Sequence, residues 1–214
     1  MKKIVLFDLD GTLIDSTEAI LESFYYSLAQ LNHPHELEDE AIKALIGHPL
    51  DVMFTRLGCD VDKIEAHVLE YKEHYRTISR AKTFLLPEAH AAIIEASKHA
   101  RLGIVTTKTA RYSKELMEHF GLMHYFEVLI GHEDVESHKP HPEPIHKALE
   151  GMDHALEEVW MIGDTRLDLE ASQRAGIDAV GVLTGYDNFE QLSTFNFIIK
   201  ENALEAVRYI INRG

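Results

Sequence analysis

Short apolar runs alternate with longer amphipathic segments along most of the chain, and this alternation constrains the fold more than any other feature. Six runs have the length and composition of buried strands: 4–7, 102–106, 128–130, 159–162, 179–182 and, more weakly, 197–199. Helical patterns lie between or after them, at 110–120, 143–149, 167–175 and 203–211. This order predicts an α/β fold, with a doubly wound, mostly parallel sheet covered by helices on both faces.

One connection departs from the alternation. Between the first two strands, apolar residues recur only at helical spacing, as in Ile20, Phe24 and Leu28 and again in Val68, Tyr71 and Tyr75. The stretch is too long for one crossover helix. We therefore predict an α/β core domain formed by residues 1–14 and 85–214, and an inserted all-helical domain formed by residues 15–84.

The acidic composition limits the kinds of molecule that the protein is expected to bind. The 214 residues include 21 basic and 36 acidic side chains, a formal net charge of −15, so we expect neither a nucleic-acid nor a membrane partner. The single cysteine, Cys59, allows no intrachain disulfide, and no apolar stretch approaches the roughly 18 residues of a transmembrane helix. These features predict a soluble cytoplasmic protein. The sequence leaves open whether it is a monomer or a homodimer.

Polar residues follow the predicted strands at their carboxyl ends, where doubly wound sheets bind ligands. Asp8 and Asp10 follow the first strand, and the later strands lead to a further set: Thr106, Thr107, Lys108, Lys139, Asp164 and Asp168. A lone Asp-x-Asp-Gly is compatible with a helix cap or a turn. The convergence of acids, hydroxyls and a lysine on one sheet edge favours a site.

These groups suit phosphoryl transfer. A carboxylate can attack phosphorus and form an aspartyl-phosphate, and a second one, two residues away, can transfer protons. Mg²⁺ prefers oxygen ligands and would offset the carboxylate charge, while a lysine and a hydroxyl would hold the phosphoryl oxygens. Gly11 would let the chain turn sharply, with its neighbours' N–H groups near the phosphate.

The same residues resemble the four motifs of the haloacid dehalogenase (HAD) superfamily, in order and over essentially the whole chain. The segment Asp-Leu-Asp-Gly-Thr-Leu at 8–13 resembles the first motif and Thr106 the second. Lys139, in His-Lys-Pro-His-Pro, resembles the third, and Gly-Asp-(x)₃-Asp at 163–168 the fourth. The inserted helices are similar to the family's cap domain. Residues 46–50 and the Lys-Pro-x-Pro segment most resemble the phosphoglycolate phosphatase and pyrophosphatase branch.

The resemblance implies a role for each motif residue. Asp8 would be the nucleophile and Asp10 the general acid and base. Mg²⁺ would be held by Asp8, Asp164 and the main-chain carbonyl of Asp10. The remaining assignments are phosphate binding by Thr106, Thr107 and Lys139, support by Gly11, Thr12 and Asp168, and substrate selection by Gly47, His48, Arg56 and Lys108. Lys43 is a further candidate for contacting a substrate carboxylate from the cap.

The resemblance also shows one departure. Residues 86–89, Leu-Pro-Glu-Ala, stand where members of the family often carry Pro-Gly followed by an apolar residue. We expect this segment to begin the helix after the cap, with Pro87 at or near its first turn.

We therefore expect a Mg²⁺-dependent phosphatase that hydrolyses a small phosphorylated metabolite through an aspartyl-phosphate, with 2-phosphoglycolate as the leading substrate. Inorganic pyrophosphate and other sugar or nucleotide phosphates are alternatives. A phosphomutase similar to β-phosphoglucomutase and a non-catalytic binding module also remain open. Haloacid dehalogenation is disfavoured because Asp10 is present, where dehalogenases usually lack that acid.

Overall fold

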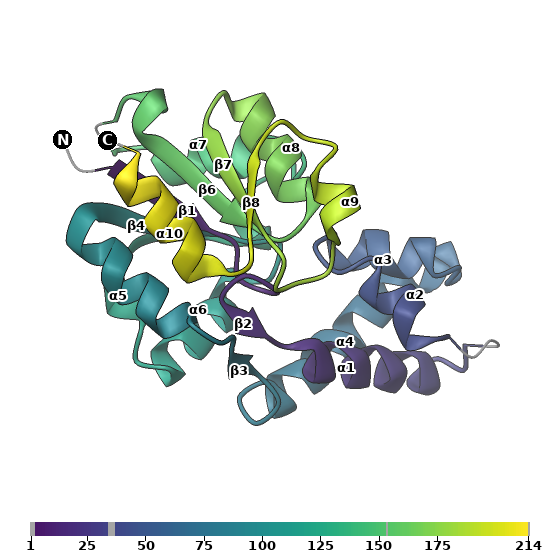
Figure 1. The fold of residues 1–214 in the computed structure, drawn as a ribbon. Coiled ribbons are helices and arrows are strands. Elements are labelled where there is room, and N and C mark those ends of the chain that lie inside the picture. The colour runs from purple at the N-terminus through teal and green to yellow at the C-terminus, as the bar shows by residue number, and fades with distance from the viewer. Residues whose placement is uncertain (1–2, 34–36, 153, 214) are drawn as a thin grey trace.

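A six-stranded parallel sheet forms the centre of the molecule, in a computed structural model that describes residues 3–33, 37–152 and 154–213 (Figure 1). The strand order is β5-β4-β1-β6-β7-β8, and every neighbouring pair is parallel. The strands are β1 (Lys3–Phe7), β4 (Ala100–Val105), β5 (Phe126–Ile130), β6 (Val159–Gly163), β7 (Asp178–Val182) and β8 (Ile198–Lys200). The predicted fold class is confirmed.

Helices cover both faces of the sheet, which explains why its strands are apolar on both sides. In β1, Val5 and Phe7 join the cluster that packs against α5 (Ala89–His99), α6 (Ala110–His119) and α10 (Ala203–Asn212). Ile4 and Leu6 point the other way, toward α7 (Glu143–Leu149) and α8 (Arg166–Ala175). Alternate residues of one strand thus build two separate cores.

The predicted core elements agree with the observed ones to within two residues. Four strands, β1, β4, β5 and β7, begin one or two residues before their apolar runs, and in β1 and β7 the added residues are the polar Lys3 and Asp178. Thr106 lies just beyond β4, although its N–H still donates to the carbonyl of Ile130 at 2.9 Å. Short elements complete this part: η2 (Met123–Tyr125), η3 (His132–Asp134), η4 (Leu156–Glu158) and α9 (Phe189–Leu192).

The segment between β1 and β4 contains a separate group of helices beside the sheet (Figure 1). These are α1 (Thr17–Gln30), α2 (Asp39–Lys43), α3 (Leu50–Arg56), the 3₁₀ turn η1 (Val61–Lys63) and α4 (Ile64–Ile78). They share an apolar cluster of their own, in which the rings of Phe24, Phe54 and Tyr71 are in contact. We refer to residues 15–84 as the cap; this division of the chain stays a prediction.

Two very short strands lie where the chain passes between the sheet and the cap. Ile14 of β2 (Ile14–Asp15) pairs antiparallel with Leu85 of β3 (Phe84–Leu85). The sequence pattern showed only helices here, because two residues are too few to reveal an alternation of apolar and polar positions.

The helix after β3 begins at Ala89, so Pro87 precedes its first turn. Glu88 stands before the helix with a φ of 67°, in the left-handed region that favours glycine. Pro87 therefore lies near the first turn, as predicted, immediately before the residue that caps the helix, and Glu88 occupies the strained position of the connection. Among the described residues, no helix has the length and apolarity needed to cross a bilayer.

Candidate active site at the carboxyl edge of the sheet

A tight turn after β1 sets the positions of Asp8 and Asp10. The buried residue Leu9 lies between them, and its carbonyl accepts hydrogen bonds from the N–H groups of Leu13 at 2.9 Å and Ile14 at 3.0 Å. Gly11, with a φ of 82°, allows this reversal. The two carboxylates thereby leave the end of the strand while the residue between them stays in the apolar core.

Lys139 is the centre of a buried charged cluster. Its Nζ lies 2.9 Å from Oδ1 of Asp8 and 2.5 Å from Oδ1 of Asp168, and it donates to the carbonyl of Val105 at 3.1 Å. All three charged side chains are buried. With Asp164, which lies beside them, they form what we call the aspartate–lysine cluster. The ammonium group of Lys139 is thus fixed by three residues that are far apart in sequence, Asp8, Val105 and Asp168.

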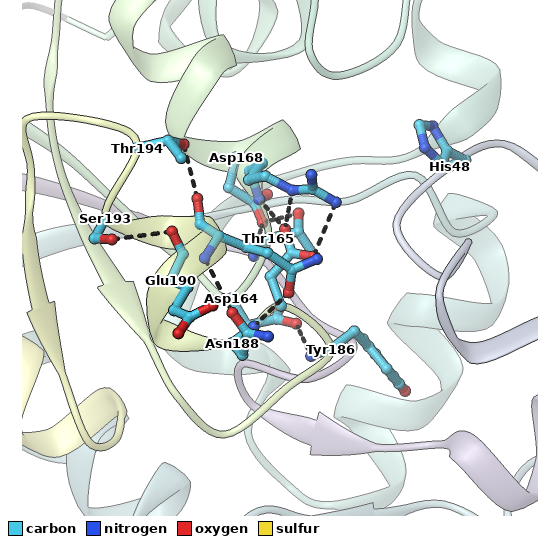
Figure 2. Close-up of polar contacts among 12 residues, drawn as sticks. His48, Asp164, Thr165, Asp168, Tyr186, Asn188, Glu190, Ser193 and Thr194 are labelled. Carbon is cyan, nitrogen blue, oxygen red and sulfur yellow. Dashed lines mark hydrogen bonds and ion pairs between the residues drawn. The ribbon is translucent and has the colours of Figure 1, made fainter. Parts of the chain in front are cut away.

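Asp164 is held from several sides just before α8. Thr12 Oγ1 donates to its Oδ1 at 2.9 Å. The N–H of Tyr186 donates to its Oδ2 at 2.9 Å (Figure 2). Two glycines make room for it: a Cβ on Gly11 would lie 2.3 Å from Oδ2 of Asp164, and one on Gly185 would lie 1.9 Å away. The carboxylate is therefore enclosed, and neither glycine position has space for a side chain.

Asp168 has protein partners on both carboxylate oxygens. Its Oδ2 accepts from the N–H of Thr165 at 3.0 Å and from the Thr165 hydroxyl at 2.7 Å (Figure 2). Its Oδ1 pairs with Lys139. This residue thus ties the start of α8 to the lysine. The geometry agrees with a positioning role and leaves little ligand capacity for a metal.

Burial beside other charged groups shifts the pKa of Asp8, Asp164 and Lys139. Burial, together with the negative charge of Asp168, raises the pKa of Asp8 to about 7, although Lys139 counteracts this. Burial and the charge of Asp8 also raise the pKa of Asp164 well above its ordinary value. For Lys139, burial disfavours the ammonium form, but the two neighbouring carboxylates outweigh it and raise its pKa.

The donor set fits a hard divalent cation. Carboxylate oxygens of Asp8, Asp164 and Asp168 lie within 4.8 Å of one another. Oxygen donors of this kind are preferred by Mg²⁺, and the surplus of negative charge in a buried place favours a cation there. Asp168 accepts two hydrogen bonds on Oδ2 and contacts the ammonium group of Lys139 with Oδ1. Each oxygen of Asp164 accepts one hydrogen bond, and Asp8 contacts Lys139 through Oδ1, so Asp8 and Asp164 retain more capacity to bind a cation.

Asp10 turns its carboxylate away from this cluster and toward the cap. Its Oδ2 lies 3.2 Å from Nζ of Lys108, and its Oδ1 accepts a hydrogen bond from the hydroxyl of Ser16. Lys108 also lies 4.5 Å from the ring centre of Tyr75 on α4. Burial opposes the charge of Lys108, but Asp10, Tyr75 and Tyr71 together outweigh it and raise the pKa of the lysine. The metal role predicted for Asp10 therefore concerns only its main-chain carbonyl.

The two threonines after β4 have different surroundings. The hydroxyl of the buried Thr106 accepts from the N–H of Lys108 at 3.2 Å. The hydroxyl of Thr107 donates to the carbonyl of Gly47 at 2.9 Å and so joins the sheet side to the cap. Thr106 and Thr107 were both predicted to bind phosphate; Thr107 lines the cavity beside the cap, whereas Thr106 does not.

A cavity of about 100 Å³ begins at Asp10 and Lys108 and extends between the sheet edge and the cap. We call it the apolar cavity, because most of its wall is formed by side chains such as Ile20, Leu50, Met53, Val68, Tyr71 and Tyr112. The cluster residues Asp8, Asp164 and Lys139 do not line it. The cavity therefore lies beside Asp10, on the cap side of the charged cluster.

The predicted specificity residues are only partly in this wall. Gly47, His48 and Lys108 line the apolar cavity, whereas Arg56 does not; its guanidinium donates to Nε2 of His48 at 2.9 Å. His48 lies apart from the aspartates in the close-up (Figure 2). Lys43 pairs with a neighbouring glutamate on α2 and is also absent from the wall.

The sequence interpretation missed the loop after β7. Thr184 donates from its hydroxyl to the carbonyl of Gly11 at 2.7 Å, and Gly185 and Tyr186 enclose Asp164. The strand itself was predicted, so a signal was available: Gly185 lies three residues beyond the end of β7, and a glycine allows close approach of the backbone to another group.

Comparison with known proteins decides the family. The model of the haloacid dehalogenase-like hydrolases matches residues 5–182. The chain belongs to this family. Pyrophosphatase PpaX of Anoxybacillus flavithermus is 35% identical over 89% of this chain and 88% of its own length. A phosphoglycolate phosphatase of Photorhabdus laumondii is 30% identical over 91% of this chain and 86% of its own length.

A solved haloacid dehalogenase-like family hydrolase from Streptococcus pneumoniae has the same fold. It superposes with a TM-score of 0.88 at 27% identity, covering 97% of this chain and 98% of that one. The family and the hydrolase class predicted from the sequence are thus confirmed, while the role of each site residue stays a prediction.

Proposed function

We propose that the protein is a Mg²⁺-dependent phosphatase that hydrolyses a small phosphomonoester through an aspartyl-phosphate on Asp8. The observation that carries this proposal is the buried contact of 2.9 Å between Asp8 and Lys139, with Asp164 beside it. A carboxylate held next to a fixed ammonium group and a cation-binding oxygen set can approach an anionic phosphate. The names of the relatives, pyrophosphatase and phosphoglycolate phosphatase, support phosphate chemistry.

In the first half-reaction a carboxylate oxygen of Asp8 attacks phosphorus, and the bond from phosphorus to the ester oxygen breaks. Asp10 gives its proton to the departing oxygen, so the alcohol leaves neutral. Lys139 and Thr106 hold the phosphoryl oxygens. Mg²⁺, held by Asp8, Asp164 and the main-chain carbonyl of Asp10, would supply positive charge against the phosphate and the carboxylates.

In the second half-reaction Asp10 takes a proton from water while the water oxygen attacks phosphorus. The bond from phosphorus to Asp8 breaks, which releases inorganic phosphate and restores the carboxylate. Lys108 and Ser16 orient Asp10 toward the cavity, where the alcohol would leave and the water would enter. The same carboxylate therefore acts first as an acid and then as a base.

The substrate panel follows from the resemblance and the relatives. It contains 2-phosphoglycolate first and inorganic pyrophosphate second, followed by sugar and nucleotide phosphates. Product analysis of the sugar phosphates separates hydrolysis from a phosphomutase, which would give an isomer in place of free phosphate.

The test is phosphate release by the purified protein with and without Mg²⁺. We expect release that requires the metal and that falls on the order of 10⁴-fold or more in Asp8→Asn. Asp62→Asn is the matched control, because Asp62 is an exposed carboxylate on the cap. Full activity of Asp8→Asn, or no release from any member of the panel, would overturn the proposal.

A further inference from the structure

The apolar cavity has the chemical character of a binding site for hydrocarbon. Its wall brings side chains from α1, α3 and α4 of the cap together with Tyr112 of α6. Ile20, Met53 and Tyr71 in this wall are each at most 5% exposed. Such side chains stabilise apolar groups that leave water.

The charges in the wall cancel. Asp10 and Asp51 contribute two carboxylates, and Lys72 and Lys108 contribute two ammonium groups. Burial lowers the pKa of the two lining histidines, His48 and His132, so both are neutral at pH 7. An anionic group that enters the cavity therefore finds no net positive charge, in contrast to a phosphate beside Lys139.

The size of the cavity limits its occupant. An apolar cavity of about 150 Å³ is known to hold a benzene molecule. The volume of about 100 Å³ found here suits a somewhat smaller group. A chain of roughly four carbon atoms fits this description.

We propose that the leaving group of the substrate is an uncharged hydrocarbon chain of about four carbon atoms, bound in the apolar cavity. This rests on the proposed function, because it assumes that the ester is cleaved at Asp8 with the alcohol departing toward Asp10. It orders the candidate substrates differently from the names of the relatives, since it places alkyl phosphates above 2-phosphoglycolate and pyrophosphate.

Two matched pairs of substrates test the proposal on the unmodified protein with Mg²⁺. Butyl phosphate and ethyl phosphate differ only in two methylene groups, and we expect kcat/KM to be about tenfold higher for butyl phosphate. 2-Phosphoglycolate and ethyl phosphate are similar in size but differ by a carboxylate, and we expect no advantage for 2-phosphoglycolate. Equal values for the two alkyl phosphates, or a tenfold preference for 2-phosphoglycolate over ethyl phosphate, would overturn the inference.

A pair of variants on α3 locates the effect. Leu50→Lys places a charge in the cavity wall, whereas Thr55→Lys places the same charge at an exposed position of the same helix. We expect the ratio of kcat/KM for butyl over ethyl phosphate to fall to about one in Leu50→Lys and to stay unchanged in Thr55→Lys. Because the readout is a ratio, a smaller fraction of folded protein does not alter it. An unchanged ratio in Leu50→Lys would show that the hydrocarbon chain is not bound in this cavity.

The two proposals fail in different ways. Phosphate release without a preference for butyl phosphate contradicts the inference and leaves the phosphatase proposal intact. Absence of phosphate release from every substrate, including the three in this series, contradicts both.

Discussion

The aspartate–lysine cluster and the apolar cavity are neighbours that differ in almost every physical respect. In the cluster, each charged group has specific partners, and Lys139 alone contacts two carboxylates and a carbonyl. In the cavity, most of the wall is apolar and Asp10 and Lys108 stand at one end. Directional contacts tolerate little change, whereas apolar contacts depend mainly on volume. In the proposed function, the cluster would therefore fix the reaction, and the cavity could accept a different leaving group while the reaction stays the same.

Removing a lysine from each region should reveal the largest difference between them in stability and activity. Lys139→Met leaves Asp8 and Asp168 buried without their cation, so we expect a loss of about 3–5 kcal/mol in unfolding free energy and about 10³-fold in kcat. Lys108→Met should cost less, about 1–2 kcal/mol, because Asp10 is partly exposed. Urea titration and phosphate release measure both. Equal destabilisation by the two substitutions would contradict the distinction between the regions.

Metal removal combined with pH tests the electrostatics of the cluster alone. The pKa of Asp8 is raised from 3.8 to about 7, so the metal-free folded state favours its protonated form. Its contribution to stability is full below pH 3.8 and is lost as the pH rises through 7. We expect the Tm without metal to fall between pH 5 and pH 8, and Mg²⁺ to raise Tm more at pH 8.

The same melting curves for Asp8→Asn provide the control, because this variant cannot lose a proton at that position. Its Tm should depend less on pH over the same range. If the Tm of the metal-free protein does not fall more between pH 5 and pH 8 than the Tm of the variant, the raised pKa of Asp8 is contradicted.

A smaller effect is expected where the two regions meet. Thr107→Val removes the hydrogen bond of 2.9 Å from the Thr107 hydroxyl to the carbonyl of Gly47. A bond of this kind contributes about 1 kcal/mol, so we expect kcat/KM to fall about fivefold if the contact holds the cap in its working position. Thr107→Ser retains the hydroxyl and should retain the activity. Equal loss in both variants would assign the effect to packing of the methyl group.

The smallest effect concerns stability outside both regions. Glu88 has a φ of 67°, which costs a residue with a side chain about 1 kcal/mol relative to glycine. We expect Glu88→Gly to raise Tm by about 2–4 °C without a change in kcat. Glu95→Gly, inside α5, should lower Tm instead, because glycine weakens a helix interior. A lower Tm in Glu88→Gly would show that its side chain stabilises the connection.

The sheet and the order of the site residues were predictable because their signals are local. Each strand shows its own apolar run, and Asp8, Thr106 and Asp164 follow directly from the ends of those runs. The ion pair of Asp10 with Lys108 was not predictable, because it depends on the direction in which two side chains leave neighbouring strands. The same limit applies to the contact of Lys139 with Asp168.

The cavity shows a second limit of sequence patterns. Tyr71 has the helical spacing of a core residue, and it does belong to the apolar cluster of the cap. The same side chain also lines the cavity. Periodicity records that a side chain avoids water, but it does not distinguish a neighbour that is protein from one that is an empty space or a ligand.

The pairing of Ile14 with Leu85 has a consequence for how the chain folds. β1 and β4 are adjacent and in register, although the whole cap separates them in sequence. Joining two distant strands of a disordered chain carries an entropic penalty that grows with the length between them. Helices form through local contacts and therefore earlier. Once α1 and α4 have packed and β2 has paired with β3, the two ends of the insertion are close together. Pairing β1 with β4 then no longer carries the entropic penalty of closing a disordered loop as long as the whole cap.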